Sequence, residues 1–306
     1  MKKNPLIIVN PKSGRGTNER QWASLTSRIH TYLGPFDFRF TTGRGDAIHI
    51  ADEEARNGRS LIVACGGDGT ISETANGIIR SGTEAELGVL PHGTGGDFRM
   101  TLGLPGDIKG ACERIKNGST HQIDVGRLKY LDRKGNEAER FFVNTASFGL
   151  SGRVADRANA SGKLLGGTVT YVAATMRTLV SFNAPEIILE LDDRPPVRLP
   201  VVTVAVANGP SFGGGMKIAP GAKVDDGLFN VIVIGDLSTA TILMNAHKLY
   251  SGTFLQMEQV SQIPAQRVKV TPVDPKAVIL LEVDGESPGS LPATFEIMPH
   301  ALRVRF

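Results

Sequence analysis

Short apolar runs alternate with helix-like stretches through the first 120 residues, and this alternation restricts the fold more than any other feature. The run Leu6–Val9 is apolar throughout and stops at Asn10-Pro11, which is typical of a strand covered on both faces. Strands are predicted over 6–9, 37–41, 60–65 and 87–90, and helices over 17–33, 46–56, 71–79 and 108–116. Asp46 is the expected N-cap of the second helix. Strand and helix in repeated order predict an α/β domain with a doubly wound parallel sheet.

The pattern changes near residue 120, after which strand-like runs follow one another between Gly, Pro and Asp turns. Strands are predicted over 122–128, 141–145, 186–191, 201–207, 228–234, 268–271, 277–283 and 294–297, with helical insertions over 167–180 and 238–250. This order is typical of an antiparallel β-sandwich. We therefore expect two domains, over 1–120 and 121–306.

Composition narrows the class of protein. The 306 residues, 41% hydrophobic and 21% charged, are typical of a folded chain of about two domains. Cys65 and Cys112 are too few for a disulfide framework, which favours a reducing cytosol. No apolar stretch approaches the roughly 18 residues of a spanning helix. A net charge of +3 without a long basic run gives no reason to expect nucleic acid as a partner.

The strongest motif is Gly66-Gly67-Asp68-Gly69-Thr70, between a predicted strand and a predicted helix. Glycines there let backbone N–H groups approach a phosphate, and the helix N-terminus adds partial positive charge. Asp68 fits such a loop if it binds Mg²⁺ or orients a hydroxyl. The alternative is a tight strand-to-helix turn capped by Asp68 or Thr70.

Two more glycine-containing loops follow predicted strands of the same sheet, over residues 10–16 and 91–99. The carboxyl ends of parallel strands meet at one edge, which is where ligands of open α/β sheets bind. The first loop lacks the Walker A order and by itself is an ordinary strand-to-helix connection. In the second, His92 is expected to be a loop residue, and Asp97 is either a functional carboxylate or a helix N-cap.

Late in the sequence, Asp284 and Glu286 flank a glycine after an apolar run. Two carboxylates so placed could supply a general base and a metal ligand, with both side chains on one side of a continuing strand. The alternative is a polar hairpin turn.

Together these motifs resemble the lipid kinase family built on the diacylglycerol kinase catalytic domain. Asn10-Pro11, the Gly-Gly-Asp-Gly-Thr element, Pro91–Phe98, Asp226-Gly227 and Asp284-Gly285-Glu286 match in order along nearly the whole chain. The Gly-Gly-Asp-Gly-Thr element alone is shared with NAD kinases and phosphofructokinases, whereas the combination is more specific. The resemblance implies an NAD kinase-like nucleotide domain, a β-rich domain and ATP in a cleft.

The resemblance also implies a role for individual residues. The implied nucleotide contacts are Asn10, Thr41, Gly66, Gly67, Asp68, Gly69, Thr70, Ile71, Ser72 and Thr94. Glu286 corresponds to the proton acceptor with Asp284 beside it, and Asp68 and Asp97 to a Mg²⁺ and hydroxyl-orienting network. Lys223, Asp226 and Leu228 correspond to a structural Mg²⁺ site, the first and last through backbone carbonyls.

The sequence departs from the family in the loop 91–99. Gly96 stands where the family usually has Asn, and Arg99-Met100 replaces Ala-Arg. The Asn side chain is therefore lost, which bears on substrate identity more than on kinase chemistry.

These observations predict an ATP- and Mg²⁺-dependent lipid kinase of phospholipid biosynthesis, acting on diacylglycerol or a related lipid alcohol. The alternatives are an NAD kinase and a catalytically inactive nucleotide-binding regulatory module. The expected location is cytoplasmic, with peripheral membrane contact through helices 167–180 and 238–250, which carry Arg177, His247 and Lys248. Those helices could equally cap the β-domain core. A homodimer is left open.

Overall fold

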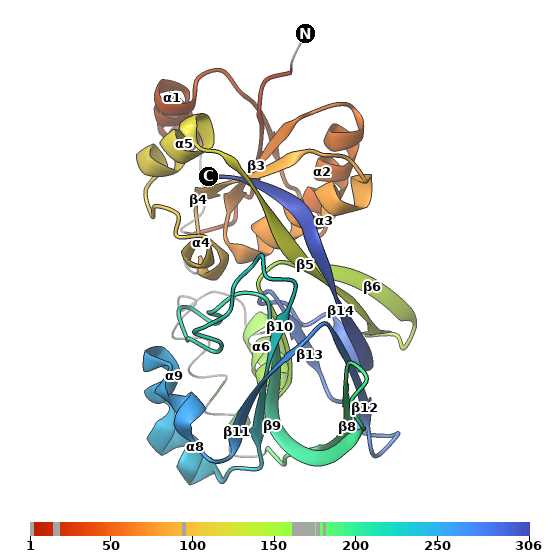
Figure 1. The fold of residues 1–306 in the computed structure, drawn as a ribbon. Helices are drawn as coiled ribbons and strands as arrows, with labels where there is room; N and C mark the ends of the chain where they lie inside the picture. Colours follow the sequence, from red (N-terminus) through yellow and green to blue (C-terminus); the bar gives the residue numbers. More distant parts are fainter. Residues whose placement is uncertain (1–2, 15–18, 94–95, 161–174, 176–177, 180–181) are drawn as a thin grey trace. The chain divides into compact units, whose positions relative to one another are not determined.

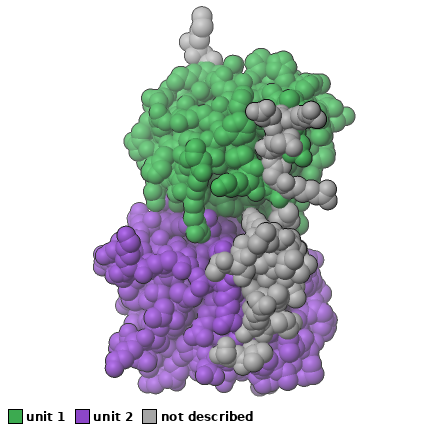
Figure 2. All heavy atoms as spheres, turned by 180° about the vertical axis from the view of Figure 1, so that it is seen from behind, with its two compact units in different colours: residues 1–124, 299–306 green, residues 125–298 purple. Residues whose placement is uncertain are grey.

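The chain forms two compact units, Met1–Asp124 with Pro299–Phe306, and Val125–Met298 (Figure 2). The computed structural model describes residues 3–14, 19–93, 96–160, 175, 178–179 and 182–306. Strands β5 (Thr120–Asp132) and β14 (Gly289–Arg305) each run from one unit into the other. The sequence pattern indicated a boundary after residue 120, but it did not indicate that residues 299–306 belong to the first unit.

The first unit contains the predicted parallel sheet. Its strands are β1 (Leu6–Val9), β2 (Asp37–Phe40), β3 (Leu61–Gly66) and β4 (Glu86–Pro91). They pair in the order β4-β3-β1-β2, and all of these pairs are parallel. The C-terminal part of β14 adds a further parallel strand beside β4, with Arg303 opposite Glu86.

Helices cover both faces of this sheet (Figure 1). They are α1 (Glu19–Leu33), α2 (Asp46–Arg56), α3 (Asp68–Ser81), α4 (Asp97–Thr101) and α5 (Ile108–Asn117). Helices α1 and α5 pack on Ile7, Val9 and Val63, while α2 and α3 pack together on the opposite face. Successive strand residues point to opposite faces, so the continuous apolar runs supply both layers. The doubly wound architecture is confirmed.

The second unit is antiparallel throughout the pairs described, which confirms the predicted β-sandwich. Its strands, besides parts of β5 and β14, are β6 (Glu137–Phe142), β7 (Thr145–Gly149), β8 (Glu186–Leu191), β9 (Val197–Ala207), β10 (Phe229–Gly235), β11 (Val260–Ala265), β12 (Arg267–Pro272) and β13 (Leu281–Val283). The first residues of β9 pair with β8, and the later ones pair with β7 and β10, so β9 belongs to both layers.

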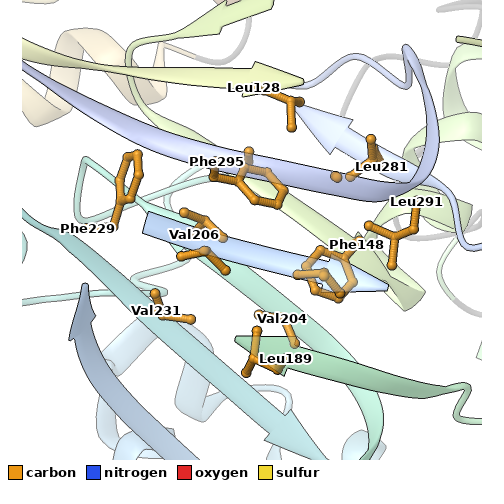
Figure 3. Packing of buried hydrophobic residues seen from close by; sticks show 14 of the residues in the cluster. Leu128, Phe148, Leu189, Val204, Val206, Phe229, Val231, Leu281, Leu291 and Phe295 are labelled. Atoms are coloured by element: carbon orange, nitrogen blue, oxygen red, sulfur yellow. The ribbon is translucent and has the colours of Figure 1, made fainter. Parts of the chain in front are cut away.

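Aromatic and branched side chains from both layers form the core of this unit (Figure 3). Phe142 stacks on Phe229 with ring centroids 5.6 Å apart and meets Phe295 edge to face. Val204, Val206 and Val231 fill the space between strands. Apolar side chains of both layers therefore fill the space between them.

Several local expectations were wrong. Gly45, not Asp46, is the N-cap of α2, and the Asp46 carboxylate accepts hydrogen bonds from the backbone and hydroxyl of Thr42. Helix α3 begins at Asp68 rather than Ile71. The predicted strand 141–145 covers the end of β6 and the start of β7.

The two helical insertions that the sequence predicted in the second unit have different outcomes. The predicted helix 238–250 is two short helices, α8 (Thr239–Asn245) and α9 (Lys248–Ser251), followed by a 3-10 turn, Thr253–Gln256. The predicted helix 167–180 lies mostly outside the described residues, as does Arg177. Helix α6 (Leu150–Ala160) was not predicted. None of the helices that the structure describes is long and apolar enough to cross a membrane.

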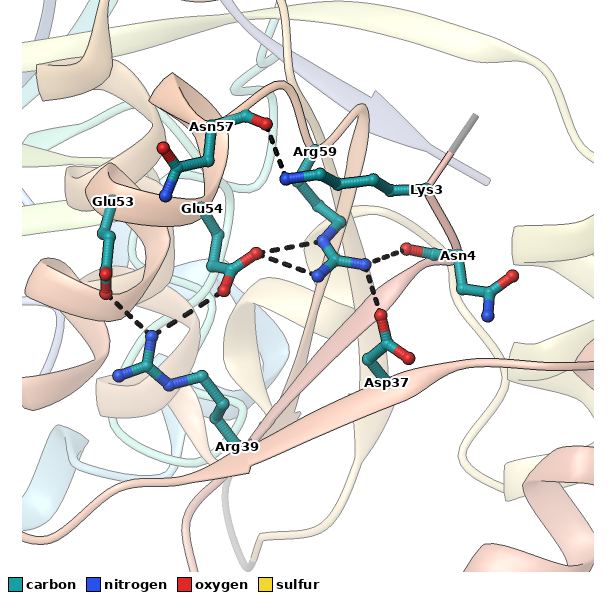
Figure 4. Close-up of polar contacts among 8 residues, drawn as sticks. All are labelled: Lys3, Asn4, Asp37, Arg39, Glu53, Glu54, Asn57 and Arg59. Atoms are coloured by element: carbon teal, nitrogen blue, oxygen red, sulfur yellow. Dashed lines mark hydrogen bonds and ion pairs between the residues drawn. The ribbon is translucent and has the colours of Figure 1, made fainter. Parts of the chain in front are cut away.

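A buried arginine ties together three segments of the first unit (Figure 4). The Arg59 guanidinium donates to the backbone oxygen of Asn4 and to the carboxylate of Asp37, both at 2.6 Å, and it forms two further bonds with Glu54. Burial lowers the pKa of Arg59, but the bonds and charges of the two carboxylates outweigh it and raise the pKa above its ordinary value. Asn4 precedes β1, Asp37 begins β2 and Glu54 lies in α2, so the cation fixes the packing of these elements.

We expect Arg59→Leu to lower the free energy of unfolding by about 3 kcal/mol, because Asp37 and the backbone oxygen of Asn4 would lose their bonds to Arg59 and Glu54 would keep only Arg39, 3.7 Å away. Urea denaturation measures the change. Arg198→Leu is the matched control, since Arg198 pairs with Glu186 at an exposed position and should cost about 1 kcal/mol or less. Equal losses of unfolding free energy in the two variants would show that the bonds of Arg59 stabilise the protein no more than a surface ion pair does.

Candidate active site

Three loops meet at the carboxyl edge of the first unit's sheet, and they are called the first, second and third loops where they follow β1, β3 and β4. β3 ends opposite the ends of its neighbours, with Cys65 beside Val9 and Gly66 beside Pro91. A Cβ on Gly93 would lie 2.5 Å from the Cα of Gly67, so the backbones of the second and third loops touch. Such an approach is open only to glycine, because any side chain would separate the two loops.

A small hollow lies at this edge, lined mainly by Gly66, Gly67, Gly93, Gly96 and Gly106, with Arg99 as its cation. Its volume is about 90 Å³. Sites for whole small molecules measure roughly 300–1,000 Å³, so this hollow suits one phosphate-sized group rather than a nucleotide. The Arg99 guanidinium supplies the positive charge that an anion requires, and the glycines leave the backbone uncovered by side chains.

The predicted nucleotide residues gather around this edge, although not all present a side chain to it. The Asn10 amide donates to the Thr70 hydroxyl at 3.2 Å, which joins the first loop to the start of α3. Thr41 is buried and its N–H donates to the backbone oxygen of Val9. Ile71 and Ser72 are buried, and Ile71 also lines the hollow. Thr94 lies outside the described residues.

Asp68 fastens two loops together. One carboxylate oxygen accepts the N–H of Gly96 at 2.7 Å, and the other accepts the N–H of Phe98 at 3.2 Å. Asp68 is the first residue of α3 rather than its N-cap, which is Gly67. It binds instead the first N–H groups of α4, which would otherwise lack partners. Asp97, the first residue of α4, is buried, and Gly96 rather than Asp97 is the N-cap.

The glycine at position 96 has a conformational explanation. Its φ is +93°, in the left-handed region that glycine and asparagine adopt most readily. The replacement of the family's Asn by Gly96 therefore preserves the backbone of this loop. A Cβ here would lie 3.2 Å from Nε of Arg99, whose Nη1 donates to the backbone oxygen of Leu104 at 2.8 Å. The arginine thus occupies the space beside residue 96.

The late carboxylates lie on a tight hairpin turn of the second unit. Val283 and Glu286 exchange backbone hydrogen bonds of 2.7 and 3.0 Å, and both Asp284 and Gly285 have positive φ, at 46° and 86°. Positive φ at both central residues defines the type I′ turn, for which Asp-Gly is a preferred sequence. The expectation that strand geometry continues past Val283 was wrong, and the hairpin alternative describes the backbone.

Asp284 holds the connection between β6 and β7. Its buried carboxylate accepts the N–H groups of Val143, Asn144 and Thr145 at 3.1–3.2 Å. The neighbouring Glu282 is also buried, and its carboxylate accepts the N–H of Gly285 at 2.6 Å and the hydroxyl of Ser147. These two carboxylates shape the turn.

Glu286 forms an ion pair with Arg140 of β6, at 2.7 Å from Nη1. The two side chains are only 16% and 14% exposed. Burial lowers the pKa of Arg140, but the charges of Glu286 and Asp284 more than compensate and raise it. The sequence analysis missed Arg140 because the run Glu137–Arg140 is polar and typical of a solvent face.

The implied structural Mg²⁺ site can be tested against its donors. Lys223, Asp226 and Leu228 lie in one turn before β10, and an Asp226 oxygen accepts the N–H of Leu228 at 3.1 Å. Carbonyl and carboxylate oxygens suit a hard cation, so the residues fit such an ion. Within the described ranges, no group of three His, Cys, Asp or Glu residues is placed to hold a metal. Mg²⁺ commonly takes only one or two carboxylates, with substrate phosphates completing its shell.

Two family models match the chain in succession. The diacylglycerol kinase catalytic domain matches residues 4–128, and the YegS C-terminal NAD kinase beta sandwich-like domain matches residues 144–306. A diacylglycerol kinase of Bacillus subtilis is 31% identical over 96% of this chain and 93% of its own length. One of Staphylococcus aureus is 27% identical over 96% of this chain and 90% of its own.

Solved structures show the same fold. A crystal structure of a diacylglycerol kinase from Bacillus anthracis has a TM-score of 0.71 at 22% identity and covers 100% of this chain and 97% of that one. Yeast NADH kinase in complex with NADH has a TM-score of 0.51 at 11% identity and covers 99% of this chain and 83% of that one. The NAD kinase-like fold class is therefore confirmed. Because two domain models follow one another and a 31% identical relative matches 96% of the sequence, this protein belongs to the diacylglycerol kinase family.

Proposed function

We propose that this protein is an ATP- and Mg²⁺-dependent kinase that phosphorylates a hydroxyl of diacylglycerol or a related lipid alcohol. The observation that carries the proposal is the glycine-walled hollow with Arg99 at the carboxyl edge of the first unit's sheet. Phosphoryl transfer depends mainly on positioning and charge stabilisation, which such a hollow supplies. Membership of the diacylglycerol kinase family supports the lipid alcohol as acceptor.

In this proposal the first unit binds the nucleotide. A phosphate occupies the hollow, where it meets backbone N–H groups, the Arg99 guanidinium and the N-terminus of the 14-residue helix α3. Asp68 keeps the third loop against α3, and Asp97 is the second carboxylate of this edge. Mg²⁺, when bound with the nucleotide, would neutralise developing phosphate charge. Loss of activity on omitting Mg²⁺ checks that dependence.

The second unit supplies the proton acceptor, and Glu286 is assigned this role. Asp284 is committed to three backbone N–H groups, so its task is to hold the turn on which Glu286 lies. Glu286 instead forms an ion pair with the side chain of Arg140. A general base of this kind contributes roughly 10²–10⁴-fold to a reaction.

The proposal is tested with labelled ATP and a panel of diacylglycerol, phosphatidylglycerol, sphingosine and NAD in detergent micelles. We expect a labelled lipid and no labelled NADP. Glu286→Gln should lower kcat by about 10²-fold or more with ATP binding unchanged, because the amide keeps its size but cannot accept the proton. Glu296→Gln is the matched control, since Glu296 pairs with Arg127 in the same unit. Labelled NADP without labelled lipid would establish the NAD kinase alternative instead.

A second prediction separates the structural role of Asp68 from its proposed role in turnover. Asp68→Asn should lower kcat by at least about 10²-fold while thermal melting shows a folded protein, because a phosphate-binding loop loses its anchor and its charge. Asp107→Asn is the control, since that carboxylate also accepts one backbone N–H, from Gly110 at 2.9 Å, at the start of α5. A folded Asp68→Asn protein with normal turnover would leave Asp68 with a structural role only.

We also propose peripheral docking on membranes through α8 and α9. Leu243, Met244 and Tyr250 are 43%, 68% and 53% exposed, and Lys248 lies among them in sequence. Exposed apolar side chains beside a basic residue suit an anionic lipid surface. The whole chain should therefore sediment with anionic vesicles more than with neutral ones, and less at high salt.

Leu243→Glu combined with Met244→Glu is expected to reduce that sedimentation at least severalfold, because both changes put charge at the apolar surface. Val197→Glu is the control, as Val197 is 55% exposed at the start of β9. If the wild type, the double variant and Val197→Glu sediment equally with anionic vesicles, α8 is not the docking surface.

A further inference from the structure

The turn that carries Glu286 has little regular structure to hold it. Strand β13 ends at Val283 and β14 begins only at Gly289, so residues 284–288 lie between the two strands. The backbone groups of Glu286 are used within the turn, where they exchange hydrogen bonds with Val283. The direction in which the Glu286 side chain points therefore depends on contacts that reach the turn from other segments.

An arginine from the hairpin between β5 and β6 makes such a contact. Nε and Nη2 of Arg133 both donate to the backbone oxygen of Ser287, at 3.2 and 2.8 Å, one residue beyond Glu286. The start of β14 passes close to β5, because a Cβ on Gly289 would overlap the backbone oxygen of Leu131. Since the guanidinium is planar and rigid, two of its donors on one oxygen restrict where that carbonyl can lie.

Arg133 is itself held from two directions. Its Nη2 also binds the carboxylate of Asp156 in α6, and the two side chains are 55% and 32% exposed. The hairpin that carries Arg133 is fixed by Asp132, whose carboxylate accepts the N–H groups of Lys134 and Asn136, both at 2.8 Å. Because exposed ion pairs add little to stability, the main effect of Asp156 is to orient the guanidinium.

Helix α6 reaches the turn a second time through Asn159. Its Nδ2 donates to the backbone oxygen of Gly285 at 3.5 Å, and Asp156 and Asn159, three residues apart, lie on one face of the helix. The helix also packs closely on the segment that leads into β13, because a Cβ on Gly152 would overlap the backbone oxygen of Leu280. Helix α6 and the β5–β6 hairpin therefore support the turn from outside.

We propose that Arg133 is a positioning residue for phosphoryl transfer, which acts through the backbone of Ser287 to hold the Glu286 carboxylate at the lipid hydroxyl. As the lipid oxygen bonds to the γ-phosphorus of ATP and the bond to ADP breaks, the hydroxyl proton passes to Glu286. Arg140 holds the same carboxylate directly. The inference rests on the proposed lipid kinase activity and on Glu286 as its proton acceptor. A general base works only within hydrogen-bond reach of its proton, so a small shift of the turn slows turnover.

The first test measures steady-state kinetics with dioleoylglycerol. Arg133→Ala should lower kcat by about tenfold or more with KM for ATP and for the lipid unchanged, because a misplaced base slows the chemical step and not binding. Arg133→Lys should restore most of kcat, since an ammonium can still pair with Asp156 and donate to Ser287. Arg194→Ala is the matched control, because Arg194 also donates to a backbone oxygen of this unit, that of Pro264 at 3.4 Å, and it should keep wild-type kcat.

A double-variant cycle with Glu286→Gln separates positioning of the base from general support of the fold. If Arg133 acts through Glu286, adding Arg133→Ala to Glu286→Gln should change kcat by less than about twofold. A merely structural residue would lower kcat by the same factor in both backgrounds. Thermal melting shows whether each protein folds, and Asp156→Ala, expected to lower kcat in the same direction, replaces Arg133→Ala if that variant does not.

Full turnover by Arg133→Ala, or an equal loss of kcat with and without Glu286→Gln, overturns the inference alone. A wild-type protein that labels no lipid overturns the proposed function, and full turnover by Glu286→Gln overturns its proton acceptor. Either of these two results removes the inference as well.

Discussion

Backbone can touch backbone at the carboxyl edge of the first unit's sheet because the residues there have no side chains. Gly67 and Gly93 come from different loops, yet a methyl group on Gly93 would reach the Cα of Gly67. The contact brings the backbones of both loops together at the hollow. Only then can Asp68 reach across to the first turn of α4. The candidate phosphate site therefore exists because its glycines have no side chains, and the carboxylate of Asp68 holds its loops in place.

The carboxylates of Asp68 and Asp284 connect segments that lie far apart in the sequence. Asp68 binds N–H groups 28 and 30 residues further along the chain, and Asp284 binds three that lie 139–141 residues earlier. A carboxylate can accept several backbone bonds at once, which lets one side chain hold a loop that has no regular structure of its own. A phosphate near one of these carboxylates would repel it. Hydrogen bonds from backbone N–H groups hold each carboxylate in place without a further cation.

Much of the fold followed from the sequence, and the failures have physical causes. Continuous apolar runs revealed β1, β3 and β4 because strands covered on both faces leave no polar residue in the pattern. The reversal of the backbone at Asp284 matches the hairpin alternative, which the alternation of Asp284 and Glu286 alone cannot distinguish from a continuing strand. Arg140 was not found since its partner is Glu286, 146 positions later (286 − 140), and only tertiary structure joins them. The glycine loops were located, but the bonds of Asp68 to Gly96 and Phe98 depend on how the loops pack.

Residues 299–306 return to the first unit and pair with β4. The N–H of His300 binds the buried carboxylate of Asp124, and Phe306 stacks on His121. During synthesis the first unit therefore has an open sheet edge at β4, besides the edge at β2, while about 170 residues of the second unit are made (298 − 124 = 174). The pairing of β14 with β4 joins residues 217 positions apart (303 − 86), so contacts that are slow to form belong to the unit that is translated first. A ribosome-bound fragment that ends before residue 299 would carry an unpaired parallel edge at β4, exposed to chaperones and to other chains.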